Sequence, residues 1–108
     1  MSKLKEIMNV KGVVAAGEFS DEGNLLAFEG DMSEDEAAMA AQMCAANKMM
    51  GQMQVDGFTA MSGEDGWTPV VGFALSGPKM SVCVEGNIGV FVDNDNVSFN
   101  EVFGALRS

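Results

Sequence analysis

The sequence predicts an α+β domain in which helices flank a five-stranded antiparallel sheet. One observation is that short apolar runs are separated by brief Gly-bearing turns, which is typical of hairpins. A second is that one long central segment repeats its apolar residues at helical spacing. A third is that the 108 residues contain no Pro-rich or Ser-rich linker, so we expect one domain over residues 1–108. The predicted element order is α-β-β-α-β-β-β-α.

The first third of the chain predicts a helix and a hairpin. Residues 3–8 place their apolar side chains on one side of a short helix. Residues 13–19 and 24–28 are apolar runs typical of strands, and residues 20–23 have the Asp-x-Gly chemistry of a tight turn. We therefore expect the two runs to pair antiparallel.

A long helix is predicted over residues 33–53. Ser33 and Glu36 have the spacing of a capping box, in which each side chain satisfies a backbone amide at the helix start. Five apolar residues follow at spacings of four, three, four and three, and so fall on one stripe of the helix. We call this set the methionine stripe: Met39, Met43, Ala46, Met50 and Met53.

The rest of this helix is hardly polar. A second apolar row consists of Ala38, Ala41, Ala45 and Met49. A helix that is apolar on more than one side needs more than one cover. We expect the protein's own sheet to be one cover and a second copy of the same helix to be the other, which makes the methionine stripe the predicted dimer interface.

The segment after the helix gives a weaker signal. Residues 58–61 fit either a continuation of the helix after a break or a short strand, within the Gly-bearing stretch 57–66. Trp67, the only tryptophan, fits either a partly exposed partner anchor or the core. Three strands joined by two-residue breaks then predict a meander over residues 69–76, 79–85 and 88–93.

A polar turn and a helix are predicted at the end of the chain. Ser98 and Glu101 have capping-box spacing ahead of an apolar-faced helix. The turn over residues 93–96 resembles the start of a calcium loop. However, its sixth position is Ser98 instead of glycine, and its twelfth is Gly104 instead of glutamate. We therefore interpret it as a turn.

Charge and composition exclude several classes of function. The net charge of −10 repels nucleic acid and anionic membranes. The chain lacks histidine, the commonest general base and metal ligand. Cys44 and Cys83 lie 39 positions apart and fit small buried thiols. With neither a signal peptide nor an apolar run long enough to span a bilayer, we expect a cytoplasmic protein without cofactor, metal or catalytic residues.

Three short segments resemble the roadblock / dynein light chain family, and most closely one of its small prokaryotic branches. They are Lys-Leu-Lys-Glu-Ile at residues 3–7, Gly-Val-Val at residues 12–14 and Gly-Asn-Leu-Leu-Ala at residues 23–27. In that family the long middle helix and the strand after it form a homodimer, and the two sheets join into one. The resemblance implies that the partner of the methionine stripe is the same helix in the other subunit.

The resemblance also implies a non-enzymatic role. Members of the family act as dimeric platforms that bind Ras-like small GTPases, motor subunits or signalling proteins, and some stimulate a partner's GTPase activity. Two alternatives stay open. One is a small-ligand or redox-sensing domain that uses Phe73, Cys83 and Phe91 on the concave side of the sheet. The other is a subunit of a larger enzyme complex. A soft-metal site on the methionines is disfavoured against an interface, because exported copper proteins are its usual users.

Overall fold

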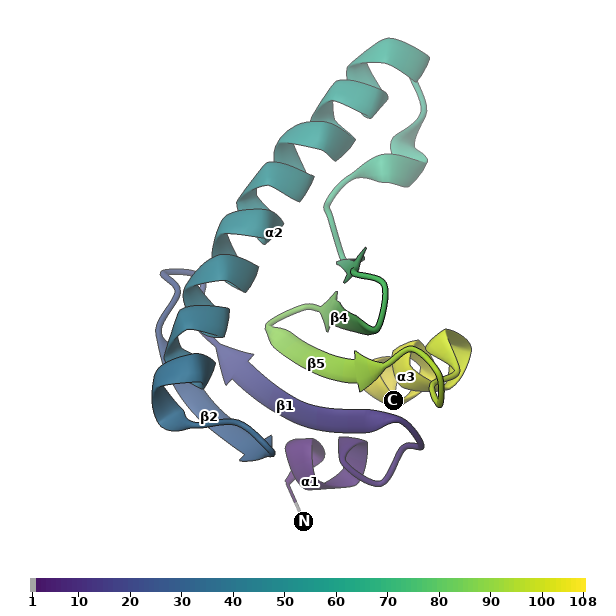
Figure 1. Ribbon diagram of the computed structural model, residues 1–108. Helices are drawn as coiled ribbons and strands as arrows, with labels where there is room; N and C mark the ends of the chain where they lie inside the picture. Colours follow the sequence, from purple (N-terminus) through teal and green to yellow (C-terminus); the bar gives the residue numbers. More distant parts are fainter. Residues whose placement is uncertain (1) are drawn as a thin grey trace.

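The computed structural model describes residues 2–108 and has the predicted order of helices and strands (Figure 1). One short 3-10 helix, η1, is added between the long helix and the meander. The elements are α1 (Lys3–Ile7), β1 (Val13–Phe19), β2 (Leu25–Gly30), α2 (Glu34–Ser62), η1 (Asp65–Trp67), β3 (Gly72–Ser76), β4 (Met80–Glu85), β5 (Ile88–Asp93) and α3 (Phe99–Arg107).

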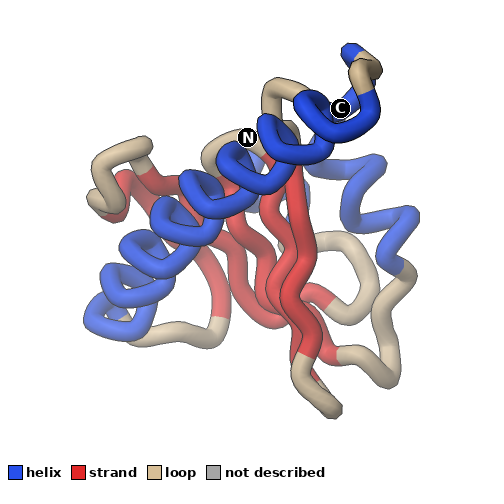
Figure 2. The backbone as a smooth tube through the Cα atoms, turned by 90° about the horizontal axis from the view of Figure 1, so that it is seen from above, coloured by secondary structure: helices blue, strands red, loops and turns tan. Residues whose placement is uncertain are grey.

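The five strands form one antiparallel sheet with the order β2-β1-β5-β4-β3. The hairpin and the meander are joined by the pairing of β1 with β5. Because β2 and β3 are the two edges, the chain must pass from one edge to the other between them, and α2 makes this connection across one face (Figure 2). The predicted fold class is thereby confirmed.

The core consists of two buried clusters on opposite faces of the sheet. The cluster under α1 and α3 contains Leu4, Ile7, Ala16, Cys83, Val90, Val92, Val102 and Leu106. The cluster under α2 contains Phe19, Ala41, Cys44, Ala45 and Val84. Neighbouring residues of β4 belong to different clusters because successive strand side chains point to opposite faces. The side chains on the face of α2 that contacts the sheet are small, so the helix can pack close to the sheet.

The long helix α2 begins as predicted and ends later. Ser33 and Glu36 form both hydrogen bonds of the capping box, at 3.1 and 2.9 Å. The predicted end at Met53 is wrong, since the helix continues without a break through Gly57 to Ser62. An exposed glycine costs a helix only about 1 kcal/mol. The helix ends where Gly63 adopts a left-handed φ of 73°.

The second half of α2 projects beyond the sheet, and the chain returns beside it through η1 (Figure 1). We call residues 49–67 the arm. The side chain of Gln52 ties the returning chain to α2, since it donates to Thr68 Oγ1 at 2.9 Å and accepts from the backbone N–H of Val70 at 3.0 Å. β3 begins at Gly72 and not at residue 69 as predicted, and the N–H of Val70 is bonded to Gln52 instead of to a neighbouring strand.

Other boundaries differ only slightly from the prediction. β2 continues to Gly30, and α3 is capped by Ser98, whose hydroxyl accepts from the N–H of Glu101 at 3.4 Å. The reciprocal bond of a full capping box is not formed between Ser98 and Glu101. No helix within residues 2–108 has the length and apolar character needed to cross a membrane.

Candidate interaction surface

The methionine stripe is exposed along α2, away from the residues of this helix that pack on the sheet. The exposed fractions are 60% for Met39, 61% for Met43, 58% for Met50 and 73% for Met53, and Ala46 is exposed between them. Buried Ala37 lies nine residues before Ala46, about two and a half helical turns, and therefore on the opposite side of the helix. The protein's own sheet covers the small residues alone. Contact of the stripe with a second copy stays a prediction.

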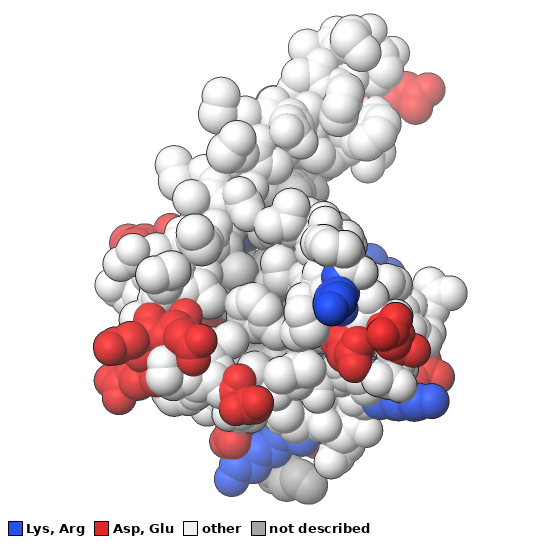
Figure 3. Space-filling view, viewed as in Figure 1, with Lys and Arg blue, Asp and Glu red and all other residues white. Residues whose placement is uncertain are grey.

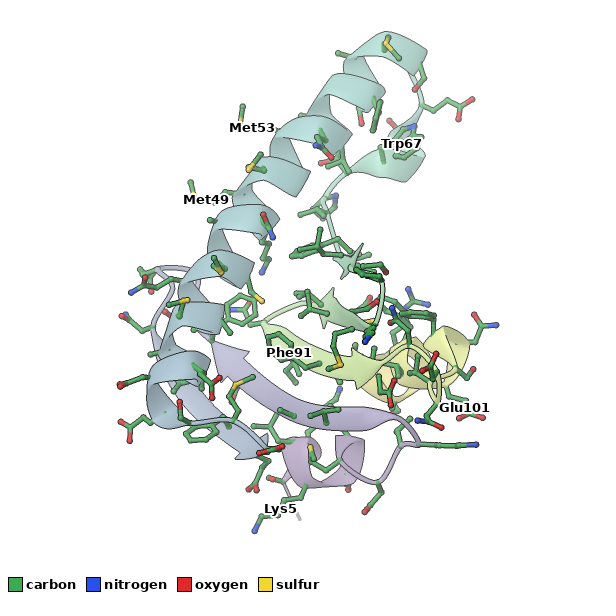
Figure 4. All side chains as sticks on the ribbon, viewed as in Figure 1. Lys5, Met49, Met53, Trp67, Phe91 and Glu101 are labelled. Carbon is green, nitrogen blue, oxygen red and sulfur yellow. The ribbon has the colours of Figure 1, made fainter. Side chains whose placement is uncertain are left out.

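A groove runs beside the stripe, between the first half of α2 and the outer strands of the sheet. It has a volume of about 690 Å³. Met39 and Met43 line one wall, and the facing wall comes from Leu75 on β3, Val82 on β4 and Phe91 on β5. Figure 4 marks the position of Phe91 on the sheet below α2. The groove forms because α2 packs most closely on β1 and β2, leaving this part of the sheet uncovered.

The edge strand β3 borders the same groove. In the described part of the chain β3 pairs only with β4, so one row of its backbone groups has no strand partner. Its side chains are largely exposed, and Leu75 is 61% exposed. An unprotected edge of this kind is a template for pairing with another strand. The groove and the edge therefore form one continuous apolar surface.

Charges lie at the margins of this surface. Carboxylates gather at the N-terminus of α2, whereas the arm shows almost no charge in the view of Figure 3. The backbone N–H of Ser33, followed by its hydroxyl, lowers the pKa of Glu36. On the other side of α2, hydrogen bonds from Asn87 and Lys48 lower the pKa of Asp21, which pairs with Lys48 at 3.3 Å. Two of the carboxylates at the N-terminus of α2, Asp35 and Glu36, line the groove itself, and its remaining lining is mostly apolar.

Trp67 lies on the arm, apart from the methionine stripe. Its ring stacks on Phe58 with centroids 4.8 Å apart and remains 45% exposed. It belongs to neither buried cluster. Figure 4 shows Trp67 on the returning chain, whereas Met53 points away from that chain on the other side of α2. The structure therefore does not bring these predicted site residues together.

The residues of the sensor alternative do not form one site. Phe91 lines the groove under α2 and Phe73 packs on the cluster of that face, but Cys83 is buried in the cluster of the opposite face. The expectation that all three share the concave side is therefore wrong for Cys83. Its strand neighbour Val82 takes the groove position because it is paired with Phe91.

The thiols and the acidic turn show little reactive chemistry. Both cysteines are buried, on opposite faces of the sheet, and burial raises the pKa of each thiol. In the acidic turn, the carboxylate of Asp93 accepts from the N–H of Asp95 and the side-chain amide of Asn96, as a turn residue does. Across residues 2–108, no three His, Cys, Asp or Glu side chains are grouped so as to hold a metal ion.

Sequence reasoning missed the groove. Leu75, Val82 and Phe91 come from three different strands, and only the sheet order and register bring them together. The alternating direction of side chains along β4 and β5 indicated that each strand contributes to both faces of the sheet. It did not indicate which face α2 would leave open, because that depends on where the helix crosses the sheet.

The sheet order, with one long helix crossing from edge to edge, is the fold of the Roadblock/LC7 domain. A Roadblock/LC7 domain from Streptomyces avermitilis superimposes with a TM-score of 0.82 at 14% identity, covering 97% of this chain and 86% of that one. The gliding protein MglB from Thermus thermophilus gives 0.77 at 15% identity, covering 97% and 78%. Myxococcus xanthus MglB gives 0.71 at 17% identity, covering 98% and 81%.

The family can be stated more narrowly than the fold. The chain belongs to the family described as "Uncharacterized conserved protein (DUF2173)", which matches residues 3–108. No curated protein matches the chain. The resemblance to the roadblock family is confirmed as a likeness of fold, since the identities of 14 to 17% reach no further.

Proposed function

We propose that this protein is a non-enzymatic, homodimeric interaction module whose two copies pair through the methionine stripe and the adjacent groove. The observation that carries the proposal is the exposure of four methionines on one helix beside an apolar groove of about 690 Å³. Burying a methionine side chain contributes roughly 1.5–3 kcal/mol, less for chains already half covered. Two symmetric copies would bury eight such side chains, a gain that opposes the free-energy cost of association.

The stripe is suited to pairing with itself. Ala46 lies at its middle, Met39 and Met53 lie seven residues to either side, and Met43 and Met50 lie three and four residues away. In an antiparallel pair of identical helices, such a pattern places Met39 opposite Met53 of the partner subunit and Ala46 near the two-fold axis. A small residue at the axis allows the helices to approach closely, and the larger residues can then enter the groove of the other copy.

A cysteine placed at the proposed axis tests this register. In the Ala46→Cys variant, mild oxidation should link two chains through a disulfide, because symmetry brings the two thiols together. Met49→Cys is the matched control, since Met49 lies on the same helix, is 68% exposed and faces the side lined by Asp21 and Pro69. Non-reducing electrophoresis should show a linked dimer for Ala46→Cys alone. Equal linking of both variants, or of neither, would contradict the register.

The family resemblance supports a protein partner for the dimer, such as a small GTPase or a signalling subunit. One solved relative in fold is described as MglB with a tetrameric arrangement, at 15% identity. In this chain Trp67, half exposed at the end of the arm and stacked on Phe58, is the proposed partner anchor. Partly exposed tryptophans are enriched among the residues that dominate protein interfaces.

Small-ligand sensing is a second candidate function because the groove lies within the size range of ligand pockets, about 300–1,000 Å³. Its lining of methionine and phenylalanine suits an apolar ligand. Both functions would fill the same groove, so what occupies the groove distinguishes them. A small molecule that copurifies with a monomeric protein would favour sensing, and a dimer without bound mass would favour the interaction module.

A further inference from the structure

Methionine is distributed unevenly between the core and the surface of this protein. Among residues 2–108, the buried hydrophobic residues include leucine, isoleucine, valine, phenylalanine, alanine and cysteine but no methionine. Six of the ten methionines are exposed on α2. Leucine and methionine exchange readily at apolar contacts. A permanent interface would therefore be served equally well by leucine, and the difference that remains is the flexible, oxidisable thioether.

On the surface formed by the stripe and the groove, the accessible sulfur groups are the methionine thioethers. Cys44 lines the groove but is buried within the cluster under α2. Burial raises the pKa of its thiol, so the reactive thiolate is scarce. The stripe methionines are more than half exposed in the single chain and need no deprotonation to react.

From this distribution we infer that Met39, Met43, Met50 and Met53 are sites of reversible oxidation by hydroperoxides, and that their oxidation separates the two copies of the chain. The inference rests on the proposed homodimer. In the reaction a thioether sulfur attacks the outer oxygen of the hydroperoxide, an S–O bond forms and the O–O bond breaks. The sulfur loses two electrons to give the sulfoxide, which keeps the outer oxygen; with hydrogen peroxide, the leaving hydroxide takes the proton of that oxygen and departs as water.

The sulfoxide changes the interface because it is polar. A buried S=O group without a hydrogen-bond donor is unfavourable, and the side chains that line the groove are mostly apolar. The oxidant reaches the sulfurs through the population of separated chains, in which they are exposed. Oxidation would then trap the separated form. Because the core contains none of these residues, the fold of each chain should survive.

The test compares solution mass before and after treatment of the purified protein with hydrogen peroxide. Peptide mass mapping identifies the oxidised residues, and size-exclusion light scattering measures the mass. We expect sulfoxides at the four stripe positions, an increase of about tenfold or more in the dimer dissociation constant, and unchanged far-ultraviolet circular dichroism. Dithiothreitol alone should not reverse the change, whereas methionine sulfoxide reductases of both stereospecificities should.

Two variants make the outcome specific. The variant with leucine at all four stripe methionines should stay dimeric in peroxide, and Met49→Leu should dissociate as the native chain does. Absence of sulfoxides at the stripe, an oxidised chain that stays dimeric, or dissociation of the four-leucine variant in peroxide would each overturn the inference while leaving the homodimer standing. A native chain that is monomeric before treatment would instead overturn the proposed function, and this inference with it.

Discussion

At the scale of single residues, the covered face of α2 consists of small side chains. Ala41, Cys44 and Ala45 are buried against the sheet, while the larger methionines are exposed on the other side. The sequence allowed the stripe to be predicted because helical spacing depends on local geometry alone. Cys83 was assigned to the wrong face because a shift of one position along a strand reverses the direction of a side chain.

The cap of α2 links one carboxylate to stability. Hydrogen bonds from the backbone N–H and then the hydroxyl of Ser33 lower the pKa of Glu36 below its ordinary 4.5. A carboxylate whose pKa is lower in the folded than in the unfolded chain stabilises the fold at pH values above its unfolded-state pKa. This contribution is lost as the pH falls through its folded-state pKa.

We therefore expect Glu36→Gln to lower the free energy of unfolding at pH 7 and to lower it less at pH 3, because protonation of Glu36 at acid pH removes the contribution of its charge. Urea unfolding followed by circular dichroism at both pH values measures the difference. A loss of equal size at pH 7 and pH 3 would contradict a role for the carboxylate charge.

At the scale of elements, the sequence predicted the order of helices and strands because capping residues and turn chemistry are local signals. It did not predict the length of α2, since Gly57 resembles a break in the pattern but is tolerated in an exposed helix. The contact between Phe58 and Trp67 is made in the part of α2 that lies beyond the predicted end of the helix.

We predict that the protein partner binds at the arm. A tagged Trp67→Ala variant should capture less of any stoichiometric partner from extract of the native host than the native chain does, because the exposed ring is the proposed anchor. Its solution mass should not change, since Trp67 lies apart from the stripe. Met49→Leu is the control and should capture the native set of proteins. Identical capture by Trp67→Ala would contradict the role of the arm.

At the scale of the whole molecule, the chain has two apolar surfaces and covers only one of them itself. The groove could not be predicted from the sequence, because its residues are brought together by the pairing of β3, β4 and β5 and by where α2 crosses the sheet. The uncovered groove, the open edge of β3 and the stripe are continuous. The central claim is that a second copy covers all three.

The most direct test is the solution mass of the native chain beside that of two glutamate variants, by size-exclusion light scattering across micromolar concentrations. We predict twice the chain mass of 11.4 kDa for the native protein and for Leu26→Glu, since Leu26 is 60% exposed on β2 and points to the face of the sheet opposite α2. We predict 11.4 kDa for Met43→Glu, because an unpaired charge would be buried near the two-fold axis. A native chain that is monomeric throughout, or a Met43→Glu dimer indistinguishable from the native one, would contradict the account.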